Sequence, residues 1–172
     1  MGGRIVLHRA LAEPDRWVAL VLVGVSAGVD DPAGRRATDE ELATWIERTA
    51  IEQVVERWEA QPVFATQSPE LVAAQRPGRL SHDPAELARL LRTYGQGAMP
   101  GVWDQLPRLD LPVLLLAGEL DHNYVTAGER MAALMPNAVF VPIPDAGHAP
   151  QLEQPDAVAE QIDNFCGGLR GR

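Results

Sequence analysis

Three short apolar segments stand out in the pattern of hydrophobic and polar positions along the chain. Residues 18–23, 112–117 and 138–142 carry almost no polar side chains, and a glycine follows each of the first two. Short segments that are apolar on both faces are typical of strands buried within a parallel sheet. We therefore expect these three segments to form parallel strands of one sheet.

Segments with apolar residues at helical spacing lie around the expected strands, at residues 5–11, 124–134 and 155–165. Strands that alternate with helices indicate an α/β fold with right-handed crossovers. With so few strands, the outer edge of the 18–23 strand has no neighbour within the chain. Because an unpaired apolar edge favours association, self-association through this edge is expected.

The stretch between the first two strands differs, because it carries helical patterns alone. Thr38, with Glu41 three residues later, forms a capping-box pattern that predicts a long helix from Thr38 to about Ala60. Pro62 ends that helix. The preceding residues, 28–36, are expected to form turns.

Two more helices are expected at residues 69–74 and 84–94. The pattern therefore predicts that residues 30–105 form a helical cap, which is inserted into an α/β core. The core then consists of residues 1–29, with one helix and one strand, and residues 106–172, with the other two strands and the last helix.

Composition narrows the class of protein. The chain has 172 residues, of which 46% are hydrophobic and 23% charged, as expected for a folded globular domain. A net charge of −9 argues against nucleic acid or an anionic membrane surface as a partner. The single cysteine, Cys166, excludes an internal disulfide. No apolar run has the length of a membrane span and no signal-peptide layout is present, so a cytoplasmic protein is expected.

Two loops that follow expected strands carry side chains suited to acid–base chemistry. Asp121 ends the Gly-Glu-Leu-Asp segment after the second strand, and His148 ends the Asp-Ala-Gly-His segment after the third. In open α/β sheets the reactive groups lie at the carboxyl ends of the strands. A carboxylate bonded to one ring nitrogen fixes the tautomer of a histidine, and the other nitrogen can then accept a proton.

Each of the two residues also has a plainer interpretation. A lone aspartate in a loop is more often a turn or cap residue, and a lone histidine is more often an ordinary surface or core residue. Their combination, after successive strands, favours a catalytic pair. No His, Asp and Glu residues have the spacing of a metal site, and we expect neither a metal nor a cofactor.

The first residues extend this pattern. Residues 1–4, Met-Gly-Gly-Arg, resemble the segment that follows the serine in a Gly-x-Ser-Met-Gly-Gly-Arg nucleophile elbow. The order of Asp121 and His148 matches the order serine, acid, histidine of the same enzymes. The chain is therefore similar to the part of the α/β-hydrolase fold superfamily that runs from the elbow to the C-terminus, including its helical cap.

Three further stretches resemble one branch of that superfamily, the 2-succinyl-6-hydroxy-2,4-cyclohexadiene-1-carboxylate synthases of menaquinone biosynthesis. They are Arg35 with Asp39 four residues later, the Trp-Glu-Ala-Gln-Pro-Val-Phe segment 58–64, and the segment 95–103. The resemblance implies a lyase rather than a hydrolase. In that family the triad removes a proton from the substrate, pyruvate leaves, and the ring product forms.

The same resemblance implies a site for a substrate with several carboxylates. Arg4 and Arg35 are the candidate ligands, because a guanidinium can hold a carboxylate through two parallel hydrogen bonds. Arg36 is an alternative to Arg35. Trp58 is expected to line the pocket from the cap, with Gln61 nearby, although packing between cap and core would also explain a tryptophan there.

The comparison with the elbow places the nucleophilic serine just before Met1. None of Ser26, Ser68 and Ser81 is expected to replace it, and the backbone nitrogen of Met1 takes the place of an oxyanion donor. Loss of the serine lowers the rate by several orders of magnitude. We therefore expect the 172-residue chain alone to be nearly inactive. Two explanations for the missing serine stay open: a misplaced start, or a genuine fragment that is either degenerate or completed by a second chain.

Two alternatives to the lyase stay open. A general ester or amide hydrolase of the same fold would use the same Asp121 and His148, because one fold hosts many reactions. A non-catalytic fragment or interaction module would instead use the unpaired sheet edge to bind a partner. The segment from Trp58 to Phe64 favours the lyase.

Overall fold

A computed structural model describes residues 2–169, which divide into two compact units. One of them, here called the helical unit, spans Gly28–Gly101. The other, the sheet unit, comprises Gly2–Ala27 and the chain from Val102 onwards. The backbone N–H of Val102 donates to the carbonyl of Ala27 at 2.8 Å. The chain therefore leaves the sheet unit and re-enters it at adjacent positions.

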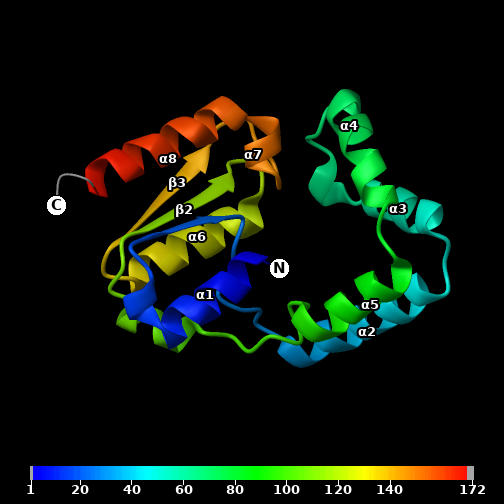
Figure 1. The fold of residues 1–172 in the computed structure, drawn as a ribbon, viewed down its shortest axis with the longest axis horizontal. Coiled ribbons are helices and arrows are strands. Elements are labelled where there is room, and N and C mark those ends of the chain that lie inside the picture. The colour runs from blue at the N-terminus through cyan, green and yellow to red at the C-terminus, as the bar shows by residue number, and fades with distance from the viewer. Residues whose placement is uncertain (1, 170–172) are drawn as a thin grey trace. The chain divides into compact units, whose positions relative to one another are not determined.

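Three parallel strands form the centre of the sheet unit, in the order β1-β2-β3: β1 Leu20–Val23, β2 Val113–Gly118 and β3 Ala138–Ile143. Strands β2 and β3 lie side by side in Figure 1. Every residue of β2 is buried, because this strand has a neighbour on each side and packed helices on each face. The parallel α/β fold predicted from the sequence is confirmed. The first strand begins at Leu20, not at residue 18 as predicted.

Helices cover both faces of the sheet: α1 Gly2–Ala12, α6 His122–Leu134, α7 Pro150–Glu153 and α8 Pro155–Leu169, with 3-10 turns η1 Pro14–Arg16 and η3 Trp103–Arg108. On one face, Val113 and Leu115 of β2 share a core with Leu7 of α1 and Met131 of α6. On the opposite face, the alternate residues Leu114 and Leu116 pack with Val158 of α8. This alternation is the period-two geometry of a strand buried on both faces.

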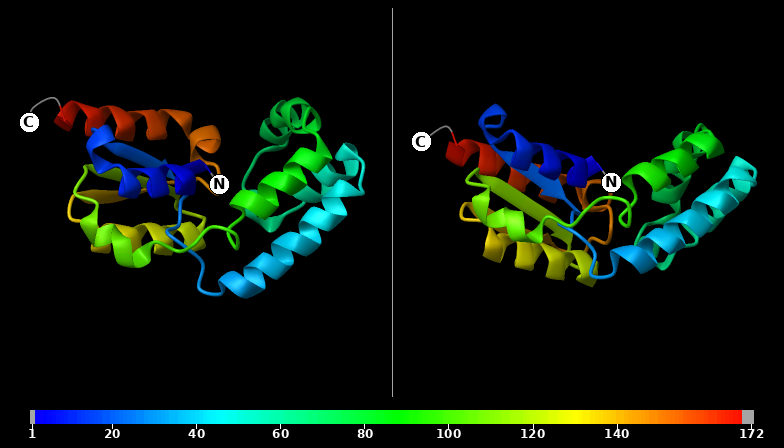
Figure 2. Two further views of the ribbon diagram at one scale, coloured as in Figure 1. Left: turned by 60° about the horizontal axis from the view of Figure 1, so that its bottom comes forward. Right: turned by 90° about the horizontal axis from the view of Figure 1, so that it is seen from below.

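The helical unit contains α2 Pro32–Glu47, α3 Ile51–Glu59, the 3-10 turn η2 Pro62–Phe64, α4 Pro69–Leu80 and α5 Pro84–Tyr94. Helices α2 and α5 lie side by side in both views of Figure 2 and share a core of Ala43, Ile46 and Ala88. A proline opens each of α2, α4 and α5 directly after a capping side chain. Proline suits this position, because the first turn has no use for its missing N–H.

The predicted start of the first helix in this unit is wrong. Asp31, not Thr38, caps α2, and its carboxylate accepts a hydrogen bond from the N–H of Gly34 at 2.9 Å. Thr38 lies inside the helix, where its hydroxyl donates to the carbonyl of Gly34 at 3.1 Å. A helix therefore begins within the stretch that was expected to form turns, because aspartate is a better N-cap than threonine and the proline after it suits the first helical position.

The predicted continuity of that helix is also wrong, because the chain breaks between Glu47 and Ile51. The hydroxyl of Thr49 donates to the carbonyl of Trp45 at 2.6 Å at this break. Neither glycine nor proline occurs in these residues. The break therefore carries none of the usual sequence signals.

Candidate active site

Two loops of the sheet unit bring Asp121 and His148 together. Asp121 follows β2 and His148 follows β3, and the Oδ2 atom of Asp121 lies 2.7 Å from Nδ1 of His148. Side-chain exposure is 10% for Asp121 and 30% for His148. The carboxylate is thus shielded from water, while the imidazole is partly exposed to solvent.

Backbone contacts hold the two loops against each other. The N–H of Glu119 donates to the carbonyl of Ile143, and that of Leu120 donates to the carbonyl of Ala146, each at 2.9 Å. Gly118 makes this approach possible, because a Cβ atom there would overlap the backbone of Ala146 and Gly147. The last residue of β2 is therefore a glycine for steric reasons.

Asp121 has a second structural role as the N-cap of α6. Its Oδ1 atom faces the N–H of Tyr124 at 3.5 Å, while Oδ2 faces His148. A carboxylate suits this position, because its charge interacts favourably with the positive end of the helix dipole. Both oxygens of Asp121 are thus held, which fixes the direction from which it meets the imidazole.

The loop of His148 is held by a residue that the sequence analysis does not single out. Glu153, in α7, accepts hydrogen bonds from the N–H groups of Gly147 at 2.8 Å and Ala149 at 3.0 Å. These two residues flank His148 in the chain. Asp145, at the start of the loop, has a φ of 55° and so turns the chain through the left-handed region.

The geometry defines what the pair can do chemically. A carboxylate only accepts hydrogen bonds, so the short contact requires Nδ1 of His148 to carry a proton. In the neutral ring, Nε2 is then unprotonated and can act as a base. The carboxylate also stabilises the imidazolium that forms after proton uptake.

Arg4 and Tyr124 lie in the same unit. Arg4, in α1, is 5% exposed. Burial lowers the pKa of its guanidinium, and the electrostatic effect of nearby Tyr124 on that pKa is in the opposite direction. The ring of Tyr124 lies 5.1 Å from the ring of His148, tilted by 59°. Tyr124 is thus a neighbour of the histidine that the sequence analysis missed, since a tyrosine near the start of a helix carries no motif.

The remaining candidate substrate ligands belong to the helical unit. Arg35 forms an ion pair with the buried Asp39, from Nε to Oδ1 at 2.7 Å. Arg36 donates to the carbonyl of Ala98 at 3.4 Å. Trp58 is 47% exposed, and its ring lies 5.5 Å from that of Phe64. Half-buried Gln61 precedes η2.

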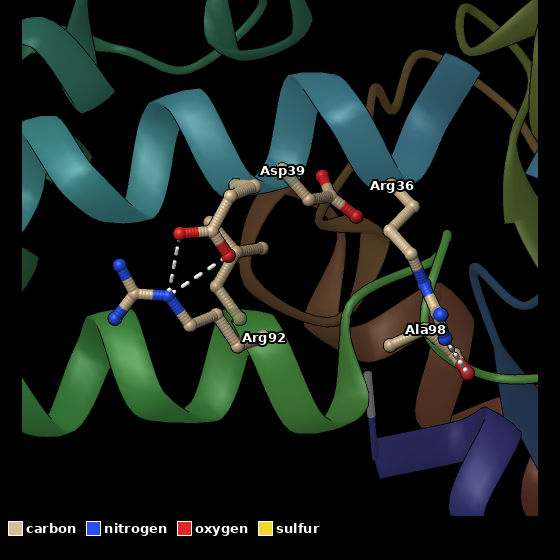
Figure 3. Close-up of a pocket in the computed structure, with 6 residues that line it drawn as sticks. Arg36, Asp39, Arg92 and Ala98 are labelled. Carbon is tan, nitrogen blue, oxygen red and sulfur yellow. Dashed lines mark hydrogen bonds and ion pairs between the residues drawn. The ribbon is translucent and has the colours of Figure 1, made fainter. Parts of the chain in front are cut away.

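A cavity of about 270 Å³ in the helical unit is lined by Arg36, Asp39, Glu40, Leu91, Arg92 and Ala98 (Figure 3). Its charges are largely satisfied within the protein. Nε of Arg92 binds both oxygens of Glu40 at 3.0 Å, and Nη1 binds Glu47 at 2.5 Å. These hydrogen bonds to Arg92 lower the pKa values of Glu40 and Glu47. The cavity therefore has charged walls but no acid–base pair like that of the sheet unit.

The serine nucleophile has no assignment among the described residues. Met1, the expected oxyanion donor, lies outside residues 2–169. The expectation that Ser26 does not follow a Gly-x-Ser-x-Gly pattern is wrong, because residues 24–28 read Gly-Val-Ser-Ala-Gly. This stretch is a loop after β1, and the next helix starts only at Pro32. Ser26 thus does not occupy a sharp turn from a strand directly into a helix, which an elbow requires.

Among residues 2–169, no group of three or more His, Cys, Asp or Glu side chains could hold a metal ion. Within the same residues, no helix is both long and apolar enough to cross a membrane.

Known proteins resemble this chain over nearly its full length. A family model described as "Alpha/beta hydrolase family" matches residues 1–161. A Serratia proteamaculans (strain 568) protein named 2-succinyl-6-hydroxy-2,4-cyclohexadiene-1-carboxylate synthase is 32% identical over 169 residues, with 96% of this chain and 64% of that protein covered. A Bacillus subtilis (strain 168) protein, provisionally given the same name, is also 32% identical, over 96% of this chain and 62% of its own length.

Solved structures give the same result. The structure of MenH from S. aureus matches with a TM-score of 0.93 and 32% identity, over 98% of this chain and 65% of that one. A thermophilic esterase from Thermogutta terrifontis, solved with malate bound, matches with a TM-score of 0.82 and 28% identity, over 98% and 62%. This chain thus spans less than two thirds of the length of these relatives.

Proposed function

The chain belongs to the alpha/beta hydrolase family, and on that premise we propose that it carries the acid–base pair of a menaquinone-pathway lyase. The proposed reaction forms 2-succinyl-6-hydroxy-2,4-cyclohexadiene-1-carboxylate with release of pyruvate. The observation that carries the proposal is the 2.7 Å contact between Asp121 and Nδ1 of His148. The proposal is also supported by the 32% sequence identity between this chain and proteins that carry the name of that enzyme.

The proposed step is an elimination. Nε2 of His148 takes part in removing a proton from a ring carbon, and the electron pair of that C–H bond forms a new ring double bond. The C–O bond to the three-carbon group breaks, and the enolate that leaves takes up a proton to become pyruvate. Asp121 stabilises the imidazolium that forms during proton removal.

Charge pairing is proposed to bind the substrate. The substrate carries several carboxylates, so a buried arginine is a suitable ligand for one of them. Arg4 is such a residue, because it is 5% exposed and lies in the unit that contains His148. Arg35, Trp58 and Gln61 are proposed as further substrate contacts, on the strength of the family resemblance alone.

One observation favours a second candidate. The thermophilic esterase has 28% identity to this chain and a TM-score of 0.82. An ester hydrolase would use the same pair, with His148 activating a nucleophile and then water. The two candidates differ in the bond that is broken, and so they can be separated by substrate.

A paired assay on the full-length protein tests the proposal. Pyruvate release is followed by a coupled lactate dehydrogenase reaction, and ester cleavage by release of p-nitrophenol. The lyase predicts pyruvate release that His148→Gln lowers by several orders of magnitude, with Glu160→Gln, an exposed change in α8, as the matched control. Ester cleavage without pyruvate release would favour the hydrolase, and an unchanged rate in His148→Gln would overturn both.

A further inference from the structure

We propose that Glu153 is a positioning residue that orients His148 by holding the chain on both sides of it. The inference deepens the proposed function and rests on it only for the kinetic part of its test. Each carboxylate oxygen of Glu153 accepts one backbone hydrogen bond, Oε2 from Gly147 at 2.8 Å and Oε1 from Ala149 at 3.0 Å.

The positions of the two donors carry the argument. Gly147 precedes His148 and Ala149 follows it, so one carboxylate bridges the peptide groups on either side of the imidazole-bearing residue. A bridge of this kind restricts the backbone dihedrals of His148, and these set the direction of its Cα–Cβ bond. Asp121 then needs to fix only the ring itself, through Nδ1.

Simple helix capping does not account for both bonds. Ala149 is the N-cap residue of α7 and has no side-chain oxygen to cap the helix. The bond from Glu153 to the N–H of Ala149 resembles the return bond of a capping box. The second bond, to Gly147, reaches past the helix start to the far side of His148, where helix capping needs no partner.

Burial makes the carboxylate hard to replace with water. Gly147 is buried and Ala149 is 8% exposed. Buried N–H groups need partners, and those bonded to a charged acceptor form stronger hydrogen bonds than those bonded to a neutral one. Removal of Glu153 would leave two such donors unsatisfied next to the candidate base, and the loop would be expected to shift.

The orientation of a base strongly affects its rate of proton removal. A misplacement of about 1 Å can lower a rate on the order of 100-fold, without any loss of substrate contacts. Glu153 itself binds loop backbone on both oxygens. Its loss should therefore act on kcat and leave KM largely unchanged, whereas loss of a substrate ligand would raise KM.

The test uses Glu153→Ala and Glu153→Gln in the full-length protein, with exposed Glu160→Gln as the control. The first readout is the NMR signal of the proton between Nδ1 of His148 and Asp121, together with the ring nitrogen shifts of His148. We expect Glu153→Ala to weaken or broaden that proton signal and to lower kcat by roughly 10- to 100-fold. We expect Glu153→Gln to lie between, because an amide offers only one acceptor.

Other results would separate the positioning role of Glu153 from the proposed lyase function. A folded Glu153→Ala variant with an unchanged His148 signal and an unchanged kcat overturns the inference. If Glu153→Ala does not fold, Glu153→Gln decides in the same way, since it retains one of the two bonds. If no pyruvate is released by any form but the His148 signal depends on Glu153, the positioning role stands and the proposed lyase function fails.

Discussion

The Oδ2 atom of Asp121 lies 2.7 Å from Nδ1 of His148, although the two residues are 27 positions apart in the chain. They meet because β2 and β3 are parallel neighbours whose carboxyl ends lie at the same edge of the sheet. The following loops then bond to each other directly, through Glu119 to Ile143 and Leu120 to Ala146. The contact is thus a consequence of strand order. Its chemical role can be tested by substitutions that leave the fold intact.

Asp121→Asn should show whether Asp121 orients the imidazole of His148 in addition to capping α6. The amide is close in shape to the carboxylate, but it cannot accept through both atoms, so the proton on Nδ1 loses its anionic partner. We expect ¹⁵N NMR of the ring to report a changed tautomer population, and the rate of the full-length protein to fall on the order of 10⁴-fold. An unchanged tautomer and rate would show that Asp121 is only the cap of α6.

Gly118→Ala should weaken the junction of the two loops. The added methyl group would overlap the backbone of Ala146 and Gly147, which cannot move aside as a flexible side chain could. We expect the free energy of unfolding to fall by about 1–3 kcal/mol, measured by urea denaturation. Gly167→Ala in α8 is the matched control, because nothing lies within 4 Å of the new methyl group, and it should stabilise by about 0.5–1 kcal/mol.

Ser26→Ala should leave catalysis nearly unchanged, despite the Gly-x-Ser-x-Gly spacing around it. Among residues 2–169, Asp145 is the one non-glycine with positive φ, so Ser26 does not have the strained backbone of an elbow nucleophile. We expect a rate change of no more than roughly twofold, equivalent to about 0.5 kcal/mol. Mass spectrometry after treatment with a fluorophosphonate provides the second check, and a label on Ser26 would contradict this interpretation.

Arg92→Met should give a pH-dependent loss of stability in the helical unit. Hydrogen bonds from Arg92 lower the pKa values of Glu40 and Glu47 in the folded protein. Groups with a depressed folded pKa stabilise the fold above their unfolded pKa, and this contribution is lost as the pH falls through the folded value. Thermal unfolding should therefore separate wild type from Arg92→Met at neutral pH, with the difference shrinking in acid. The effect should be small, since these pairs are exposed.

The control for Arg92→Met is Arg108→Met, an exposed arginine of η3. It should leave the pH dependence of unfolding as it is in the wild type. A gap between wild type and Arg92→Met that persists in strong acid would mean that packing of the arginine side chain, not its charge, stabilises α2 against α5.

Much of the sheet unit could be predicted from the sequence, because its signals are local. Strands such as β2 are uninterrupted apolar runs that end at Gly118, and burial on both faces leaves no room for polar residues. The positions of Asp121 and His148 follow from the rule that catalytic groups lie at the carboxyl ends of such strands. The fold prediction is confirmed, while the catalytic role of the pair stays a proposal.

The residues that were missed act through contacts with no local signature. In the sequence, nothing distinguishes Glu153 from an ordinary surface glutamate near a helix. Only the structure shows that both of its carboxylate oxygens accept hydrogen bonds from the backbone on either side of His148. Tyr124 becomes relevant only because α6 brings its ring to the imidazole. The start of α2 at Asp31-Pro32 does have a local signal, but the prediction rested on the capping-box pattern at Thr38 and did not consider it.

The hydrogen bond between Ala27 and Val102 has a consequence for how this protein can change. Because the chain leaves and re-enters the sheet unit at neighbouring positions, the segment Gly28–Gly101 is a single insertion between Ala27 and Val102. Evolution or a protein engineer could exchange that insertion for another of different length and shape. Asp121 and His148 both lie outside that segment, so such an exchange would leave the residues of their 2.7 Å contact unchanged.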